Sequence, residues 1–171
     1  MKPLNSLIEL AHLEDKIGHI TLRFGFEEPD SNKGRNYVYK WQASLLDALD
    51  GFLAGDGENT IENACTSLLS MCKERYSYFS VSRQDIVYDP DQIEKILLQI
   101  KTISSNLGNA FISLSFTYSP PFKQYSSIWE AQVTEGSHWH NRSIIKIQGA
   151  SFNEVCQELW GNLQKLQSNN G

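Results

Sequence analysis

The sequence predicts an α+β protein with an internal duplication, in which one α-β-β-β-α unit occurs twice and forms antiparallel sheets with helices packed on one face. Three observations predict this architecture. Two segments alternate apolar and polar residues as half-buried strands do. Two later segments share the pattern Trp-x-Ala, and two more carry the apolar stripe of an amphipathic helix behind a hydroxyl residue. In each pair, the second segment follows the first by 88 to 92 residues.

The first strand of each unit is expected at residues 19–26 and 111–118, at a constant offset of 92. The alternating apolar positions are Ile20, Leu22, Phe24 and Phe26 in the first unit and Ile112, Leu114, Phe116 and Tyr118 in the second. Trp41-Gln42-Ala43 and Trp129-Glu130-Ala131 then mark the return strand of a hairpin, at an offset of 88.

The third strand is clear in only one unit. Residues 143–148, Ser-Ile-Ile-Lys-Ile-Gln, are rich in β-branched Ile and predict a strand. The corresponding stretch of the first unit is residues 52–56, and residues 45–49 before it fit a helical turn as well as a strand. Residues 77–88 permit a short strand but do not require one.

Each unit is predicted to end in a helix that begins after Thr60 or Ser151, because a hydroxyl oxygen accepts a backbone N–H of the first turn. The apolar stripes of these two helices match at an offset of 91. The matched positions are Ile61, Ala64, Cys65, Leu68, Leu69 and Cys72 in the first helix and Phe152, Val155, Cys156, Leu159, Trp160 and Leu163 in the second.

Each unit is also predicted to begin with a helix. Asp89-Pro90-Asp91-Gln92 is a strong helix start, and Gly108 marks the end of that helix. At an offset of 90, the first-unit residues Leu7, Leu10, Leu13, Ile17 and Gly18 match Leu97, Ile100, Ile103, Leu107 and Gly108. The predicted units are residues 1–80 and 89–171, joined by a connector at 81–88. A three-stranded unit of about 80 residues is marginally stable alone, so we expect a shared core or continuous sheet in one fused, pseudo-symmetric domain.

At these residues the chain resembles the N-terminal domain of HicB-like antitoxins. The family pattern is an aromatic-x-Ala strand, a short strand, and a Gly-x-Thr-x-Glu-Glu-Ala entry into a helix. This chain shows Trp129-Glu130-Ala131 with the later entry Gly149-Ala150-Ser151-Phe152-Asn153-Glu154-Val155, and Trp41-Gln42-Ala43 with Gly57 and Thr60-Ile61-Glu62-Asn63-Ala64. The first copy has an extra residue between Gly57 and Thr60, and the leading helices have no counterpart in the family pattern. The resemblance implies this fold and the binding of protein partners.

Charge and cysteine content narrow the functional classes. The net charge of −5 and the pI of about 5.3 disfavour non-specific nucleic-acid binding, which needs clustered Lys and Arg. No apolar run is long enough to cross a membrane, and acidic residues interrupt the N-terminal segment where a secretory signal needs an apolar stretch. Three cysteines without Cys-x-x-Cys spacing indicate a reducing compartment, and we expect the cytoplasm.

No catalytic or cofactor motif is recognisable, and we expect no cofactor. His138 and His140 flank Trp139, a spacing that on a strand begins a zinc site, but no further ligand lies at a suitable spacing. The expected metal and catalytic residues are therefore none. The cysteines lie on apolar helix faces and are expected to be buried hydrophobes.

The sequence favours a non-enzymatic protein-interaction or regulatory module that binds a protein partner or a second copy of itself. The expected contact is a hairpin tip carrying His138, Trp139, His140 and Arg142, because Trp and Arg are enriched at binding hot spots. Two alternatives stay open. One is a nucleic-acid-binding protein, since helix-strand-strand-strand-helix is also the order of double-stranded RNA-binding domains. The other is an enzyme with a site between the two units.

Overall fold

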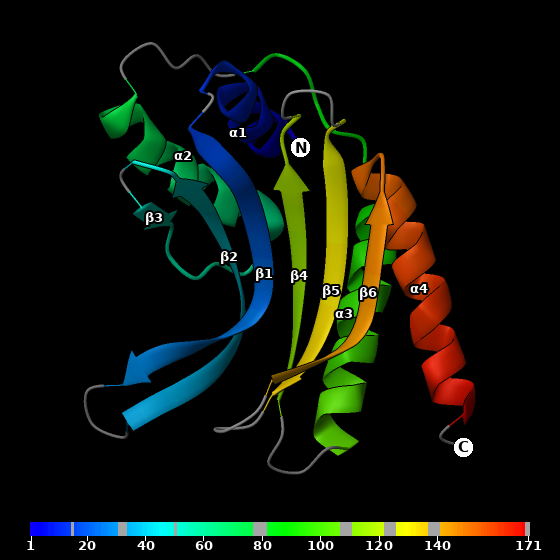
Figure 1. Cartoon of the computed structure of the whole chain (residues 1–171). Helices are drawn as coiled ribbons and strands as arrows, with labels where there is room; N and C mark the ends of the chain where they lie inside the picture. Colours follow the sequence, from blue (N-terminus) through cyan, green and yellow to red (C-terminus); the bar gives the residue numbers. More distant parts are fainter. Residues whose placement is uncertain are drawn as a thin grey trace.

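The computed structural model describes residues 1–14, 16–30, 34–49, 51–76, 82–106, 111–121, 126–136 and 141–169. The first half of the chain contains α1 (Lys2–Leu13), β1 (Ile17–Asp30), β2 (Gly34–Asp47), β3 (Gly51–Ala54) and α2 (Ile61–Arg75). The second half contains α3 (Pro90–Asn106), β4 (Phe111–Ser119), β5 (Ile128–Gly136), β6 (Asn141–Gly149) and α4 (Phe152–Asn169). The order α-β-β-β-α therefore occurs twice (Figure 1).

The described strands form one antiparallel sheet in the order β3-β2-β1-β4-β5-β6. The halves of the chain join where β1 pairs with β4, from Ile20 opposite Tyr118 to Phe24 opposite Leu114. We expected a shared core or a continuous sheet, and the strands form a continuous sheet. The antiparallel sheets named in the predicted fold class are therefore corrected to a single sheet. Pairing β1 with β4 removes two edge strands that separate sheets would expose.

The helices lie on one face of this sheet (Figure 1). Strand β4 shows the division between the two faces, because Ile112, Leu114 and Phe116 are fully buried while the residues between them are partly exposed. Buried side chains from all four helices join these strand residues in one hydrophobic core. The alternating pattern of the sequence is therefore confirmed as the division between a core face and an open face.

The trailing helices follow their predicted caps and stripes. The Thr60 hydroxyl accepts the Asn63 N–H at 3.1 Å, and the Ser151 hydroxyl accepts the Glu154 N–H at 3.2 Å. All the matched stripe positions are buried except Trp160, which is partly buried against the core. The prediction for α2 and α4 is confirmed.

The leading helices differ in how well the sequence marks them. The carboxylate of Asp89 accepts the N–H groups of Asp91 and Gln92, which confirms the predicted start of α3. Helix α1 ends at Leu13, and Ile17, expected as its last apolar residue, instead begins β1. Gly108 lies outside the described residues.

Two ambiguous segments are resolved. Residues 45–47 belong to β2, and the helical-turn reading of residues 45–49 is wrong for this part. The third strand of the first half is short, and it begins at Gly51, whose φ of +81° favours glycine. Within residues 82–88 the chain forms no strand.

Equivalent aromatic contacts refine the match between the halves. The rings of Phe24 and Trp41 lie 5.3 Å apart between centroids, and those of Tyr118 and Trp129 lie 5.2 Å apart. The two tryptophans therefore occupy equivalent places, as their offset of 88 predicts. Because Phe24 then matches Tyr118, β4 aligns with β1 at an offset of 94, and the predicted 92 is wrong by two residues. Shifting a strand alignment by two residues leaves the same side chains facing the core. The alternation of apolar and polar residues therefore does not distinguish an offset of 92 from one of 94.

Burial also corrects the match between the leading helices by one residue. The buried positions are Leu4, Ser6, Leu7, Leu10 and Ala11 on α1 and Ile93, Ile96 and Ile100 on α3. Leu4, Leu7 and Ala11 match the three isoleucines at an offset of 89. The predicted offset of 90 matches Leu10 with Ile100 but places exposed residues of α3 opposite Leu4 and Ala11. The predicted partner of Ile103, Leu13, is exposed to solvent.

Candidate interaction surface

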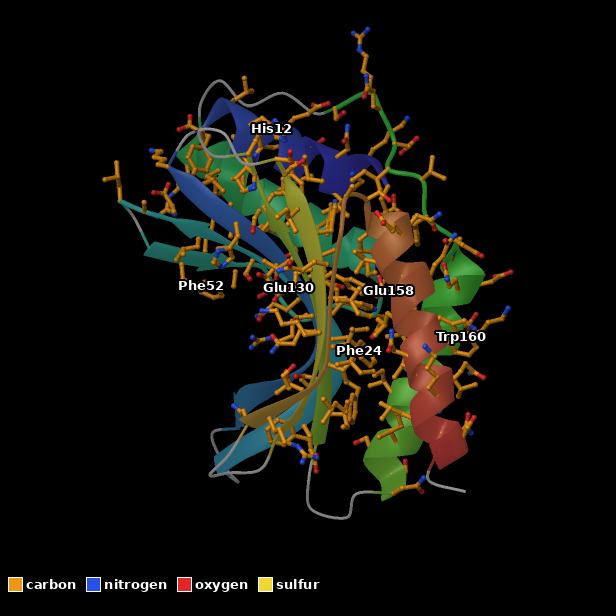
Figure 2. All side chains as sticks on the ribbon, turned by 45° about the vertical axis from the view of Figure 1, so that its right-hand side comes forward. His12, Phe24, Phe52, Glu130, Glu158 and Trp160 are labelled. Carbon is orange, nitrogen blue, oxygen red and sulfur yellow. The ribbon has the colours of Figure 1, made fainter. Side chains whose placement is uncertain are left out.

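The face of the sheet opposite the helices is lined by polar side chains, and we call it the open face. Figure 2 shows Glu130 and Phe52 on this side, whereas Phe24 points toward the helices. Cross-strand pairing places five polar residues in a central row, in the order Gln42, Arg23, Ser115, Gln132 and Lys146. The adjacent row contains Ser44, Thr21, Thr117, Glu130 and Gln148. Each row crosses the five strands β2, β1, β4, β5 and β6, and its side chains carry hydrogen-bond donors and acceptors.

The charges on the open face oppose the acidity of the whole chain. Its described side chains include the cations Arg23, Lys40 and Lys146 and the single anion Glu130. Glu130 is already engaged, because its carboxylate lies 3.1 Å from the Lys146 ammonium and accepts the Gln148 amide at 2.9 Å. Arg23 and Lys40 are exposed and form no ion pair with any residue that the structure describes. The open face therefore presents two uncompensated positive charges.

Exposed apolar residues lie at one end of the open face. Phe52 of β3 is 65% exposed and pairs across the strands with Leu46, which is also exposed. Ile128, at the start of β5, is a further exposed apolar residue. This combination of a polar field with an apolar margin suits a protein contact more than a small-molecule pocket.

The predicted contact residues at the hairpin tip are only partly placed. His138, Trp139 and His140 lie outside the described residues, so their exposure stays a prediction. Arg142, in β6, is exposed, and its guanidinium donates to the Glu135 carboxylate at 2.9 Å. An exposed ion pair of this kind contributes little to stability.

The start of α4 does not match a phosphate-binding helix end. The Glu154 carboxylate accepts the Ala150 N–H at 2.9 Å, and the Ser151 hydroxyl caps the same turn. A carboxylate therefore occupies the position where a helix N-terminus would attract an anion. At the start of α2, Glu62 also lies in the first turn.

Buried polar groups in the described part of the chain are held in structural contacts. The Tyr76 hydroxyl donates to the buried carboxylate of Asp47 at 2.7 Å, and the Lys16 ammonium lies 3.9 Å from the same carboxylate. Burial and the Asp47 carboxylate raise the pKa of Tyr76. This network ties the end of β2 to the end of α2, 29 residues away. Among the described residues, no group of three or more His, Cys, Asp or Glu side chains is arranged to hold a metal ion.

One pair of titratable groups spans the two halves. The imidazole of His12, on α1, stacks on the ring of Tyr118, on β4, and hydrogen bonds to its hydroxyl. Burial raises the pKa of Tyr118 above its ordinary value of 10.0. His12 is itself exposed, and the pairing of β1 with β4 brings Tyr118 beside it.

The sequence alone predicts that one face of the first strand is polar, but it does not predict how far the open face extends. The alternation in residues 19–26 already places Arg23 opposite the apolar positions. Periodicity does not show which face the helices cover or which strands are neighbours, so the cross-strand rows were not predictable from it.

Comparisons with known proteins assign the chain to no family. No protein-family model matches it, and no curated protein does. Among solved structures, TldE from Thermococcus kodakarensis is similar with a TM-score of 0.24 and 11% sequence identity. The match covers 96% of this chain and 47% of TldE, so the chain spans about half the length of that protein. A TM-score at this level carries no inference, and the resemblance to HicB-like antitoxins stays a prediction.

No helix in the described ranges is long and apolar enough to span a membrane.

Proposed function

We propose that this protein is a non-enzymatic interaction module that binds an acidic partner protein through the open face of its sheet. The observation that carries the proposal is the exposure of Arg23 and Lys40 without an ion pair to any described residue. Uncompensated charge of one sign raises the rate at which an oppositely charged partner associates. The rows of Ser, Thr and Gln supply the hydrogen bonds of a polar interface.

We further propose that the chain arose by duplication of one α-β-β-β-α unit. The repeated element order, the two capped trailing helices and the matching Phe24–Trp41 and Tyr118–Trp129 contacts support this origin. The three free, buried cysteines fit a reducing compartment such as the cytoplasm.

Nucleic-acid binding is the alternative function, because the same positive charges could also attract phosphate groups. Three features weigh against it. Carboxylates stand in the first turns of α2 and α4, and the open face carries few cations for a surface that must neutralise several phosphates. The two rows contain no aromatic ring on which a base would stack, and the exposed Phe52 lies outside them.

The proposal is tested by placing a photo-crosslinking amino acid at Ser115, in the central row, in the cell that produces the protein. The matched control carries the same amino acid at Gln157, on the exposed surface of α4. We expect a defined protein adduct from position 115 and none from position 157. A further Arg23→Glu substitution should remove that adduct, because it reverses the attracting charge. Equal adducts at both positions, or an RNA adduct at position 115, would contradict the proposal.

A further inference from the structure

The outer face of α1, opposite the core, is covered by the segment that follows α2. Ser82 donates its N–H to the Ser6 hydroxyl at 2.7 Å and its hydroxyl to the Glu9 carboxylate at 2.8 Å. The Asn5 amide donates to the same Ser82 hydroxyl at 2.7 Å. Further along, the Ile86 carbonyl accepts the Met1 amino group at 2.6 Å. In Figure 1, this stretch passes α1 before it enters α3.

The equivalent face of α3 is not covered by any described residue. The offset of 89 that aligns the core-facing residues places Glu94 where α1 has Asn5, Lys95 where it has Ser6, and Leu98 where it has Glu9. Ser6 is fully buried, whereas Lys95 is exposed. Leu98 is 67% exposed. Equivalent positions on α1 and α3 thus differ, because an extended segment covers them on α1 and no described residue covers them on α3.

A shallow hollow of about 500 Å³ lies over this face of α3. The residues that line it are Asp91, Glu94, Lys95, Leu97, Leu98 and Lys101. At the same offset they correspond to Lys2, Asn5, Ser6, Ile8, Glu9 and His12 of α1, three of which contact Ser82. The hollow therefore coincides with the place where the segment docks in the first half.

We propose that the outer face of α3 is a docking site for an extended peptide segment of a partner protein. On α1, the covering segment runs from Glu9 toward Met1, antiparallel to the helix. An occupant in the same direction would pass Lys101 first, then Leu98 and Lys95, and Asp91 last. Charge complementarity then requires a carboxylate beside each lysine, an apolar side chain over Leu98, and a cation near the end of the segment.

The contacts of α1 also show why the occupant must differ in chemistry from residues 82–86. Ser6 and Glu9 accept hydrogen bonds from Ser82. Lys95 and Leu98, which replace them, accept none. On α1, the covering segment contacts the helix through a serine. A segment that fits α3 must instead place acidic groups beside the lysine and apolar groups over the leucine.

The test selects binders from a displayed library of linear peptides on the whole protein. We expect an enriched pattern in which an acid stands on each side of an apolar residue and a base follows. Because a Leu side chain transferred out of water contributes about 1.5–3 kcal/mol, Leu98→Asp should weaken binding about ten- to a hundredfold. Leu13→Asp is the matched control, since Leu13 is 68% exposed on α1, and it should leave binding unchanged.

A charge exchange makes the result specific. Lys95→Glu should weaken binding of the selected peptide. Replacing the acid that follows the apolar residue of that peptide by Lys should restore binding to the Lys95→Glu protein. Circular dichroism checks that each variant is folded. The proposal is overturned if no peptide is enriched, if Leu98→Asp and Leu13→Asp act equally, or if Leu98 instead mediates self-association of the chain.

Discussion

The three cysteine thiols lie on the core faces of α2 and α4, where burial decides their chemistry. Burial raises the pKa of Cys65 and of Cys156 to about 12, and that of Cys72 to about 11, from an ordinary value of 9.0. Thiolate is the reactive form, so these groups are inert in the folded protein at neutral pH. Their role is that of small apolar side chains in the core.

Thiol labelling should therefore report unfolding. At pH 8 we expect no reaction of the folded protein with DTNB and three rapid equivalents in denaturant. A raised folded-state pKa stabilises the fold below the unfolded value of 9.0, and this contribution is lost as pH rises toward 12. The urea midpoint should accordingly fall above pH 9. Rapid labelling of the folded chain at pH 8 would contradict the burial of these residues.

Substituting alanine for each of two glycines should change the free energy of unfolding in opposite directions. A Cβ added at Gly55 would lie 2.8 Å from the Leu68 backbone nitrogen, so Gly55→Ala must push β3 away from α2. We expect a loss of about 1–3 kcal/mol in the free energy of unfolding. Gly161, within α4, has no neighbouring atom within 4 Å of an added Cβ. Gly161→Ala should stabilise by about 0.5–1 kcal/mol. Urea denaturation measures both, and equal effects of the same sign would contradict this packing.

At the scale of elements, the trailing helices offer a direct test of their equivalence. Thr60→Ala and Ser151→Ala each remove a hydroxyl that accepts a first-turn N–H. Each should cost about 1 kcal/mol, and the two costs should be similar. Thr66→Ala is the control, because its hydroxyl only donates to the Glu62 carbonyl within the same helix and alanine favours helix there. Denaturation curves showing a cost for Thr66→Ala as large as that for the caps would rule out this interpretation.

The elements that the sequence predicted well are those specified by local chemistry. Alternation gave β4, and a hydroxyl before an apolar stripe gave α2 and α4. Residues 45–49 were ambiguous because the contact that fixes Asp47 comes from Tyr76, distant in the chain. The offsets of β4 and α3 were wrong by two residues and one residue, because a periodic pattern matches itself at neighbouring positions.

The candidate surfaces depended on tertiary structure in a similar way. Arg23 and Lys146 are ordinary exposed residues in the sequence, and only strand order places them in one row. The significance of Leu98 depends on the segment that covers Ser6 and Glu9 on the other leading helix. The hairpin-tip prediction for Trp139 remains open, since that residue lies outside the described part of the chain.

At the scale of the whole molecule, the halves contact each other beyond the pairing of β1 with β4. His12 of α1 lies against Tyr118 of β4, and Lys101 of α3 lies 5.7 Å from the ring centroid of Phe24 in β1. At the offsets of 89 and 94, these two contacts are equivalent. Each leading helix thus packs on an aromatic ring of the other half, and neither half retains these contacts alone.

The halves should therefore fold together and not separately. Fragments 1–88 and 89–171, each expressed alone, should lack a cooperative thermal transition, because β1 and β4 would become exposed edge strands beside a small core. Mixing them should give a one-to-one complex with a cooperative transition, measurable by sedimentation and circular dichroism. Leu22→Asp in the first fragment should prevent the complex, since Leu22 is buried opposite Phe116 at the junction. If each fragment melts alone at the temperature of the whole chain, the shared sheet contributes nothing to stability, and the halves are independent domains.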